Sequence, residues 1–144
     1  MTSLFKAFLP FWAFKKLAFA YSTFRTLLDS PAAAMAMLAG NGERSHRFRR
    51  LTHPFTYRLN ESDKNVVMQN IVRGECIGGS IPLSAKFIVD GGGYIGDSAA
   101  VFLSLYPKAT CMVFEPSSNA ELAARNLSPY GSRAVLKRAM LARD

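Results

Sequence analysis

The stretch that decides the fold is Lys86-Phe-Ile-Val-Asp-Gly-Gly-Gly-Tyr-Ile-Gly96, in which a short apolar run ends in an acid and a cluster of glycines. A continuous apolar run of this length is typical of a strand buried in a parallel sheet. The glycines that follow predict a turn whose backbone can come close to a ligand. The stretch therefore predicts a strand, a loop and the start of a helix.

The chain after this loop alternates predicted helices and strands. Apolar residues at helical spacing predict a helix at 97–106, and apolar runs predict strands at 110–115 and 134–141. The capping-box spacing of Ser118 and Glu121 predicts a second helix at 118–127, between these strands. A strand-helix-strand-helix-strand order predicts an α/β domain with a parallel sheet. We expect this domain to span residues 51–144.

The segments before the loop are less regular. The pattern predicts helices at 3–28 and 31–38, a charged connector at 43–50, a short edge strand at 51–59 and a helix at 64–73. Pro54 confines the strand to a sheet edge, because proline has no N–H for the ladder. Ser62 or Asp63 is expected to cap the helix that follows.

The first fifty residues differ from the others in charge and composition. Residues 1–60 contain nine Lys and Arg and two Asp and Glu, whereas residues 61–144 contain nine and eight. The first thirty residues are aromatic and apolar, with lysines and Arg25 interrupting every run that could cross a membrane. We expect residues 1–50 to form a helical N-terminal extension that either packs on the domain or contacts a membrane surface through residues 1–30.

The glycine loop suits a nucleotide-like cofactor. Parallel sheets bind ligands beyond the carboxyl ends of their strands, and Glu115 ends the strand predicted to lie beside the loop. A carboxylate there can accept hydrogen bonds from two ribose hydroxyls. Residues 91–96 also fit the dinucleotide pattern G-x-G-x-x-G, so both NAD and S-adenosylmethionine are candidates.

The charge of Asp90 separates these two candidates. A carboxylate directly before the first glycine repels the pyrophosphate of a dinucleotide. S-adenosylmethionine has no phosphate and carries a cationic sulfonium and a cationic amino group, which an acid at the strand end attracts. The charge therefore favours S-adenosylmethionine, with Asp90, Gly92 and Gly96 as the relevant spacing.

The two motifs together resemble those of the FkbM family of methyltransferases, in which a strand ends D-x-G-A-x-x-G and F-E-P follows the next strand. Here the motifs read Asp90-Gly-Gly-Gly-Tyr-Ile-Gly96 and Phe114-Glu-Pro116. The resemblance covers residues 51–144, and its further matches are His53-Pro-Phe55, Arg58, Ser62-Asp63, Arg73-Gly-Glu75, Asn119, Leu122, Asn126-Leu127 and Arg138-Ala-Met-Leu141. This chain departs from the family at Gly93, where Ala is common, and at Tyr94, where Asn is frequent.

The resemblance implies a Rossmann-like class I methyltransferase fold, of which the chain carries the first three parallel strands. It implies S-adenosylmethionine as the cofactor, with the binding residues Asp90, Gly91, Gly92, Gly93, Gly96 and Glu115. Asp144 would lie near the adenine, and Tyr94 would crowd the site or stack on the ligand. The implied reaction is O-methylation of a hydroxyl on a small molecule or glycan, with no residue assigned as the base.

Other functions are weighed against this one. A non-catalytic membrane-peripheral or interaction fragment and an NAD-dependent oxidoreductase are the alternatives. Cys76 and Cys111 form no metal motif and indicate a reducing, cytoplasmic compartment. The arginines of residues 44–50 lack the aromatic platform of a nucleic-acid site, so no nucleic acid is expected.

A doubly wound fold continues for roughly three or four further strands, so we expect a truncated form with an open sheet edge.

Overall fold

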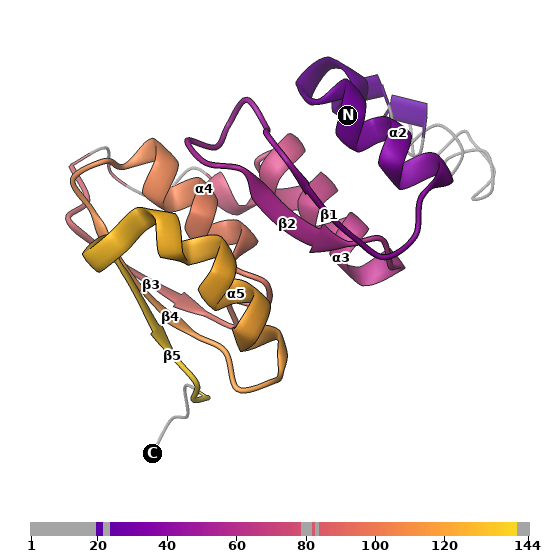
Figure 1. Cartoon of the computed structure of the whole chain (residues 1–144). Helices are drawn as coiled ribbons and strands as arrows, with labels where there is room; N and C mark the ends of the chain where they lie inside the picture. Colours follow the sequence, from indigo (N-terminus) through magenta and orange to yellow (C-terminus); the bar gives the residue numbers. More distant parts are fainter. Residues whose placement is uncertain (1–19, 22–23, 79–81, 83, 141–144) are drawn as a thin grey trace, which may run out of the picture.

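The computed structural model describes residues 20–21, 24–78, 82 and 84–140, and it has a mixed α/β architecture (Figure 1). Two sheets are present in these residues. An antiparallel pair is formed by β1 (Glu43–His46) and β2 (Phe55–Arg58), and a parallel three-stranded sheet has the order β3-β4-β5. The parallel sheet is the one that carries the glycine loop.

The parallel sheet follows the predicted order of elements. Its strands are β3 (Phe87–Gly91), β4 (Thr110–Phe114) and β5 (Ala134–Lys137). The connecting helices are α4 (Asp97–Leu105) and α5 (Asn119–Leu127), with a 3-10 turn, η4 (Ser128–Arg133), before β5. Figure 1 shows α4 and α5 on the same face of the sheet. The predicted α/β class with three parallel strands is confirmed, although β5 is shorter than expected.

The N-terminal part contains one element that the sequence did not predict. Residues 24–29 are helical, and α2 (Pro31–Ala39) ends before Gly40, as expected. The connector expected at 43–50 is wrong for residues 43–46, because these form β1 and pair with β2. Strand β1 is exposed and nearly devoid of apolar residues, which hides it from a search for hydrophobic periodicity. Both side-chain oxygens of Glu43 accept hydrogen bonds from Arg125 on α5, at 2.7 and 2.8 Å.

The helix expected at 64–73 is split and begins earlier. It consists of α3 (Glu61–Val66), a π-helix, η2 (Val67–Val72), and a short 3-10 turn, η3 (Glu75–Ile77). The predicted cap at Ser62 or Asp63 is wrong, because Asn60 is the cap and its Oδ1 accepts from the Asp63 amide at 2.8 Å. Asp63 is therefore free to take another role.

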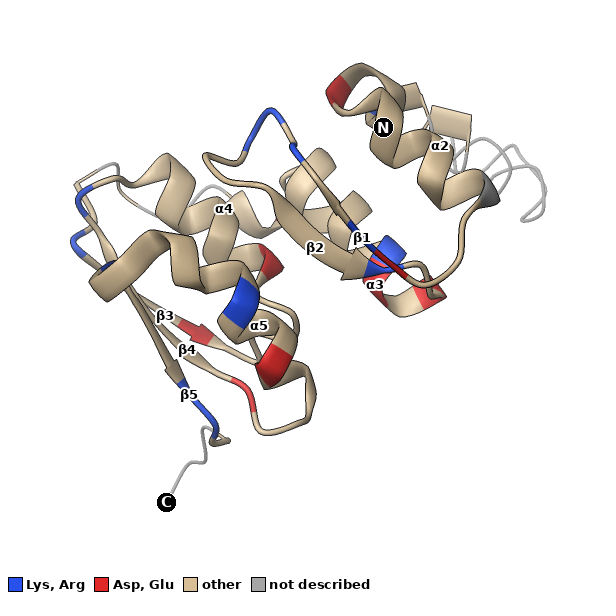
Figure 2. Cartoon of the chain, in the orientation of Figure 1, with Lys and Arg blue, Asp and Glu red and all other residues tan. Residues whose placement is uncertain are grey.

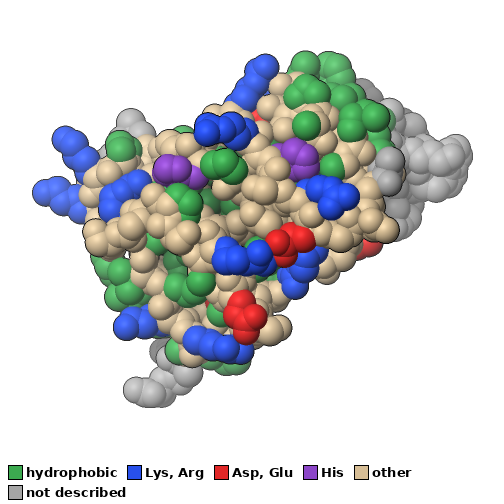
Figure 3. Space-filling model, viewed as in Figure 1, with side chains coloured by type: hydrophobic (Ala, Val, Ile, Leu, Met, Phe, Trp, Pro, Cys, Tyr) green, Lys and Arg blue, Asp and Glu red, His purple; other side chains and the backbone are tan. Residues whose placement is uncertain are grey.

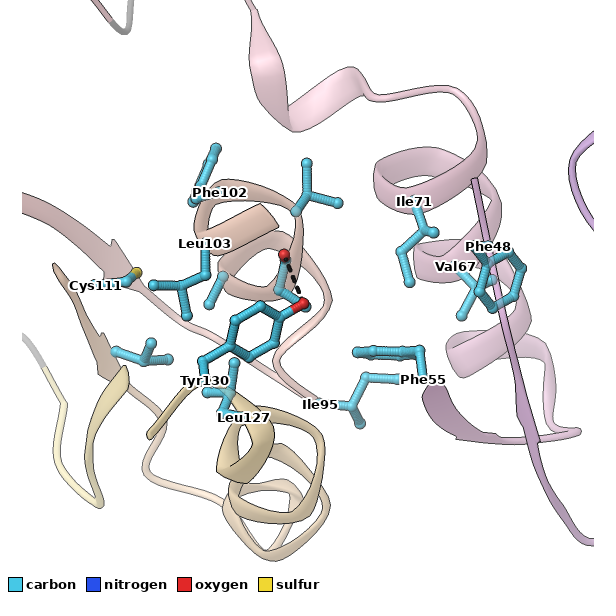
Figure 4. Close-up of a cluster of buried hydrophobic side chains, with 14 of the residues drawn as sticks. Phe48, Phe55, Val67, Ile71, Ile95, Phe102, Leu103, Cys111, Leu127 and Tyr130 are labelled. Carbon is cyan, nitrogen blue, oxygen red and sulfur yellow. Dashed lines mark hydrogen bonds between the residues drawn. The ribbon is translucent and has the colours of Figure 1, made fainter. Parts of the chain in front are cut away.

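One hydrophobic core connects these elements. It unites Phe55 on β2, Ile71 on η2, Ile95 in the glycine loop and Leu103 on α4, all of them buried. Figure 4 shows Ile95 directed toward Phe55, and the Tyr130 hydroxyl hydrogen-bonded to the carbonyl of Ala100 at 3.1 Å. Cys111 is fully buried in this core, as expected. Among the helices of the described residues, none is long and apolar enough to cross a bilayer.

Candidate functional site

The glycine loop joins β3 to α4 and lies beside the end of β4. The parallel register places Asp90 opposite Val113 and Gly91 opposite Phe114, so the loop and Glu115 leave the sheet at the same edge. Figure 2 shows acidic residues in β3 and directly after β4 at this edge. The structure thus brings together the two motifs that the sequence separates by about twenty residues, as the βαβ connection requires.

A cleft opens at this edge. Its described lining comprises Gly91 and Phe114 at the ends of β3 and β4, Gly92 of the loop, Glu115 and Pro116 after β4, and Ala139 and Met140 after β5. This lining contains one carboxylate and neither Lys nor Arg. A ligand here meets glycine backbone on one side and the Glu115 side chain on the other.

Glu115 is held in place by two backbone amides. Its Oε2 accepts from the Tyr94 N–H at 2.8 Å, and its Oε1 accepts from the Ser117 N–H at 2.9 Å. Burial raises the pKa of this carboxyl, but the hydrogen bonds from Ser117 and Tyr94 outweigh it and hold the pKa below its ordinary value. Glu115 is largely buried and is anchored by these bonds within the protein, and it is the one carboxylate of the described cleft lining.

Asp90 lies one residue before the cleft lining. Its Oδ2 accepts from the hydroxyl of Ser98, on the first turn of α4, at 2.6 Å. Burial raises the pKa of Asp90, and the hydrogen bond from Ser98 opposes that shift. A partly desolvated carboxylate is stabilised by a nearby cation, which is the ligand charge that this position suits.

Two glycines of the motif, Gly93 and Gly96, let the loop pack closely against neighbouring elements. A Cβ on Gly93 would overlap the Val113 Cγ1, so glycine is the residue that fits against β4 without a shift of that side chain. Gly96 has φ +83°, a left-handed conformation, and a Cβ there would lie 3.1 Å from Leu127. Gly93 and Gly96 therefore position the loop against β4 and α5, whereas Gly91 and Gly92 face the cleft.

The amide groups of the loop are used within the protein. Gly92 and Gly93 both donate to the carbonyl of Phe114, at 2.9 and 3.0 Å, and Gly96 donates to Gly93 at 2.7 Å. Tyr94 donates to Glu115. Dinucleotide-binding and phosphate-binding loops leave such amides free for the phosphate oxygens. The amides of Gly92, Gly93, Tyr94 and Gly96 are therefore already paired and not available to a pyrophosphate.

Two residues lie elsewhere than the sequence predicted. The Tyr94 hydroxyl donates to Asp63 Oδ1 at 2.8 Å, and Tyr94 is not part of the described cleft lining, where the sequence predicted it. Asp63 is fully buried and binds Arg58 as well, so it is neither a cap nor a residue of the cleft. The spacing of Arg58 and Asp63 around a turn was the only sequence signal for this contact. Asp144 lies outside the described residues.

Other chemistry-bearing residues lie away from this edge. His46 accepts from or donates to the Tyr57 hydroxyl at 3.1 Å, and His53 stacks edge-on against Tyr130. Within the described ranges, no group of three or more His, Cys, Asp or Glu side chains is placed to hold a metal ion. Comparison of the chain with known protein families, with characterised proteins and with solved structures gives no match.

Proposed function

We propose that the cleft binds S-adenosylmethionine and that the chain acts as a Rossmann-like class I methyltransferase, or as the cofactor-binding part of one. The observation that carries this proposal is the pairing of Glu115 with the glycine loop. Glu115 lines the cleft at the edge where the loop backbone comes close, its carboxylate is fixed by the Tyr94 and Ser117 amides, and neither Lys nor Arg is present in the described lining. This arrangement accepts hydroxyl donors and is unsuited to phosphate.

Each group has a role in this proposal. Glu115 binds the ribose hydroxyls, the backbone of Gly91 and Gly92 lies along the ligand, and Asp90 provides negative charge at the methionine end. When bound, S-adenosylmethionine supplies an activated methyl group on a cationic sulfur. The chain's contribution is to hold that methyl in line with the acceptor, which is an effect of proximity. Following the family resemblance, the acceptor proposed is a hydroxyl of a small molecule or glycan.

Calorimetric titration tests the proposal with S-adenosylhomocysteine and NAD as ligands. We expect the full chain to bind S-adenosylhomocysteine and not NAD. Glu115→Gln should weaken binding roughly tenfold or more, since hydrogen bonds to a charged group contribute about 1.5–3 kcal/mol each. Glu121→Gln, on the exposed side of α5, removes a carboxylate outside the cleft and is the matched control. Binding of NAD with equal or higher affinity would reject the proposal.

A second role, peripheral contact with a membrane, is favoured by one observation. Large apolar side chains of the N-terminal helices are exposed, namely Tyr21, Phe24, Leu27, Leu28, Met35 and Leu38. Figure 3 shows hydrophobic side chains gathered at the α2 end of the molecule. Arg25 and Arg49 line a cleft beside these helices and add positive charge, which suits anionic lipid.

Co-sedimentation with vesicles tests this second role. The full chain should sediment with phosphatidylcholine vesicles that contain phosphatidylserine, and less with phosphatidylcholine alone. Phe24→Ser should reduce the bound fraction, whereas Leu105→Ser, which changes an exposed apolar residue of α4, should not. Equal sedimentation of the two variants would mean that the exposed N-terminal residues do not bind lipid.

A further inference from the structure

The glycine loop is tied to the β2–α3 segment by a buried hydrogen-bond network. The Tyr94 hydroxyl donates to Asp63 Oδ1 at 2.8 Å, while the Tyr94 amide donates to Glu115. Tyr94 has φ +47°, in the left-handed region that residues with a side chain rarely occupy. Tyr94 thus connects Glu115, the carboxylate proposed to bind the cofactor, to the buried carboxylate of Asp63.

Asp63 cannot turn away from Tyr94, because it is held by three further donors. The backbone amide and Nε of Arg58 both bind Oδ2, at 2.9 and 2.8 Å, and Nη2 binds Oδ1 at 2.8 Å. The same Nη2 also donates to Asn119 Oδ1 on α5 at 2.8 Å. The Arg58 guanidinium lies 6.0 Å from the centre of the Tyr94 ring. The acceptor of the Tyr94 hydroxyl is therefore fully paired and fixed in orientation.

A second tie joins the same two segments. Buried Asn126 on α5 donates from Nδ2 to the carbonyls of Ile95 and Thr56, at 2.8 and 2.9 Å. Its Oδ1 accepts from the Thr56 amide at 2.9 Å. Thr56, whose backbone N–H and carbonyl bind Asn126, is two residues from Arg58 on β2. The loop is thus held against β2 at two neighbouring positions.

We propose that Tyr94 is the positioning residue of the cofactor site, and that residues 55–63 are part of the cofactor-binding unit although they do not line the cleft. The bond from the Tyr94 hydroxyl to Asp63 holds the Tyr94 amide on Glu115, and so keeps that carboxylate aimed at the ligand. Three consecutive glycines make the loop costly to order, and a loop that is already ordered binds more tightly. This inference rests on the proposed function for the identity of the ligand.

Hydrogen exchange of the full chain, without ligand, tests the network first. Tyr94→Phe removes only the hydroxyl, and we expect faster exchange in peptides that cover residues 91–96. Tyr130→Phe is the matched control, because it removes a buried hydroxyl that bonds to the Ala100 carbonyl, outside both the loop and residues 55–63. Thermal denaturation of both variants shows that they remain folded. Equal exchange of the loop in the two variants would overturn the proposal.

Addition of S-adenosylhomocysteine then tests the coupling. In the wild type the ligand should slow exchange in residues 55–63 as well as in the loop, and in Tyr94→Phe the slowing at 55–63 should be lost. Affinity should fall about tenfold in Tyr94→Phe, as expected for one hydrogen bond to a charged group, and stay unchanged in Tyr130→Phe. Protection of residues 55–63 that persists in Tyr94→Phe would contradict the positioning role. A wild type that binds no S-adenosylhomocysteine would reject the proposed function, while the ligand-free comparison would still decide whether Tyr94 orders the loop.

Discussion

Gly93 shows how a neighbouring side chain restricts the size of the residue at one position. The family resemblance places Ala here, and a glycine alone would suggest only a looser loop. The structure gives a steric reason, since the Val113 Cγ1 occupies the space where an alanine methyl would lie. Gly93 and Val113 therefore form a matched pair, in which the larger side chain on β4 requires the smaller one in the loop.

Gly93→Ala should lower the free energy of unfolding by about 1–3 kcal/mol, the usual cost of forcing an extra methyl group into a packed site. Val113→Ala in addition should recover part of the loss, because it vacates the space that the methyl needs. Urea unfolding of the single and double variants measures both effects. A Gly93→Ala variant as stable as the wild type would show that the loop shifts without cost.

At the scale of elements, a short hydrogen bond joins helix α4 to the π-helix η2. The Asn70 Nδ2 of η2 donates to Asp97 Oδ2 of α4 at 2.6 Å, and Asp97 is almost fully buried. Burial raises the pKa of Asp97 to about 6, and the hydrogen bond from Asn70 only partly opposes this shift. The interface between these two helices is therefore sensitive to pH.

The direction of this sensitivity follows from proton linkage. The pKa of Asp97 is about 6 in the folded chain and near 3.8 otherwise, so between these values the folded state binds more protons than the unfolded state. Stability contributed by Asp97 should therefore be greatest at the acid end and fall as pH rises toward about 6. Asp97→Asn should remove this slope in urea unfolding at a series of pH values, with Glu61→Gln as the control for loss of an exposed carboxylate. An unchanged slope would place the titration elsewhere.

The elements that could be predicted are those with a strong apolar signal. Apolar runs predict β3 and β4, helical spacing predicts α4 and a capping pattern predicts α5, each within a few residues, although one face of β3 is exposed and not buried as expected. Strand β1 and the cap at Asn60 were missed, because β1 has no buried face and Asn60 competes with Ser62 and Asp63 as a cap. The local sequence does not show which residues pair with β1 or which side chain caps α3, and these contacts decide both features.

The candidate site also combines residues that could be predicted with contacts that could not. Gly91, Gly92 and Glu115 could be predicted at one sheet edge, because the βαβ order alone brings them together. The contacts of Tyr94 with Asp63 and of Asn126 with Ile95 could not, since each joins residues about 30 apart in sequence that no shared motif relates. The motif thus predicts where a ligand binds, and the long-range contacts determine how firmly the loop is held.

For the whole molecule, the parallel sheet has two unlike faces. Ile88, Cys111 and Val113 point toward α4 and α5 and are buried, whereas Phe87 and Val89 on the opposite face are 57% and 52% exposed. Strand β3 is also at the edge of the sheet in the described residues. An apolar face beside an unpaired edge favours association with other chains.

Val89→Lys should therefore reduce self-association, because it places a charge on the exposed face next to the free edge of β3. Sedimentation velocity at increasing concentrations should show the wild type forming larger species and the variant less so. Leu105→Lys, an exposed apolar position on α4, is the matched control and should leave the association as it is. A wild type that stays monomeric throughout would contradict the prediction.

The hydrogen bonds that join β1 and β2 to α5 also affect the order in which the chain folds. Glu43 and Arg125 are 82 residues apart in the chain, and Thr56 and Asn126 are 70 apart. Contacts of such separation form late, after the intervening chain has been ordered. A nascent chain that has emerged only as far as Glu115 already contains both sequence motifs of the site, but it cannot yet hold the loop in its final shape. The loop can therefore take its final shape only after α5 has been synthesised.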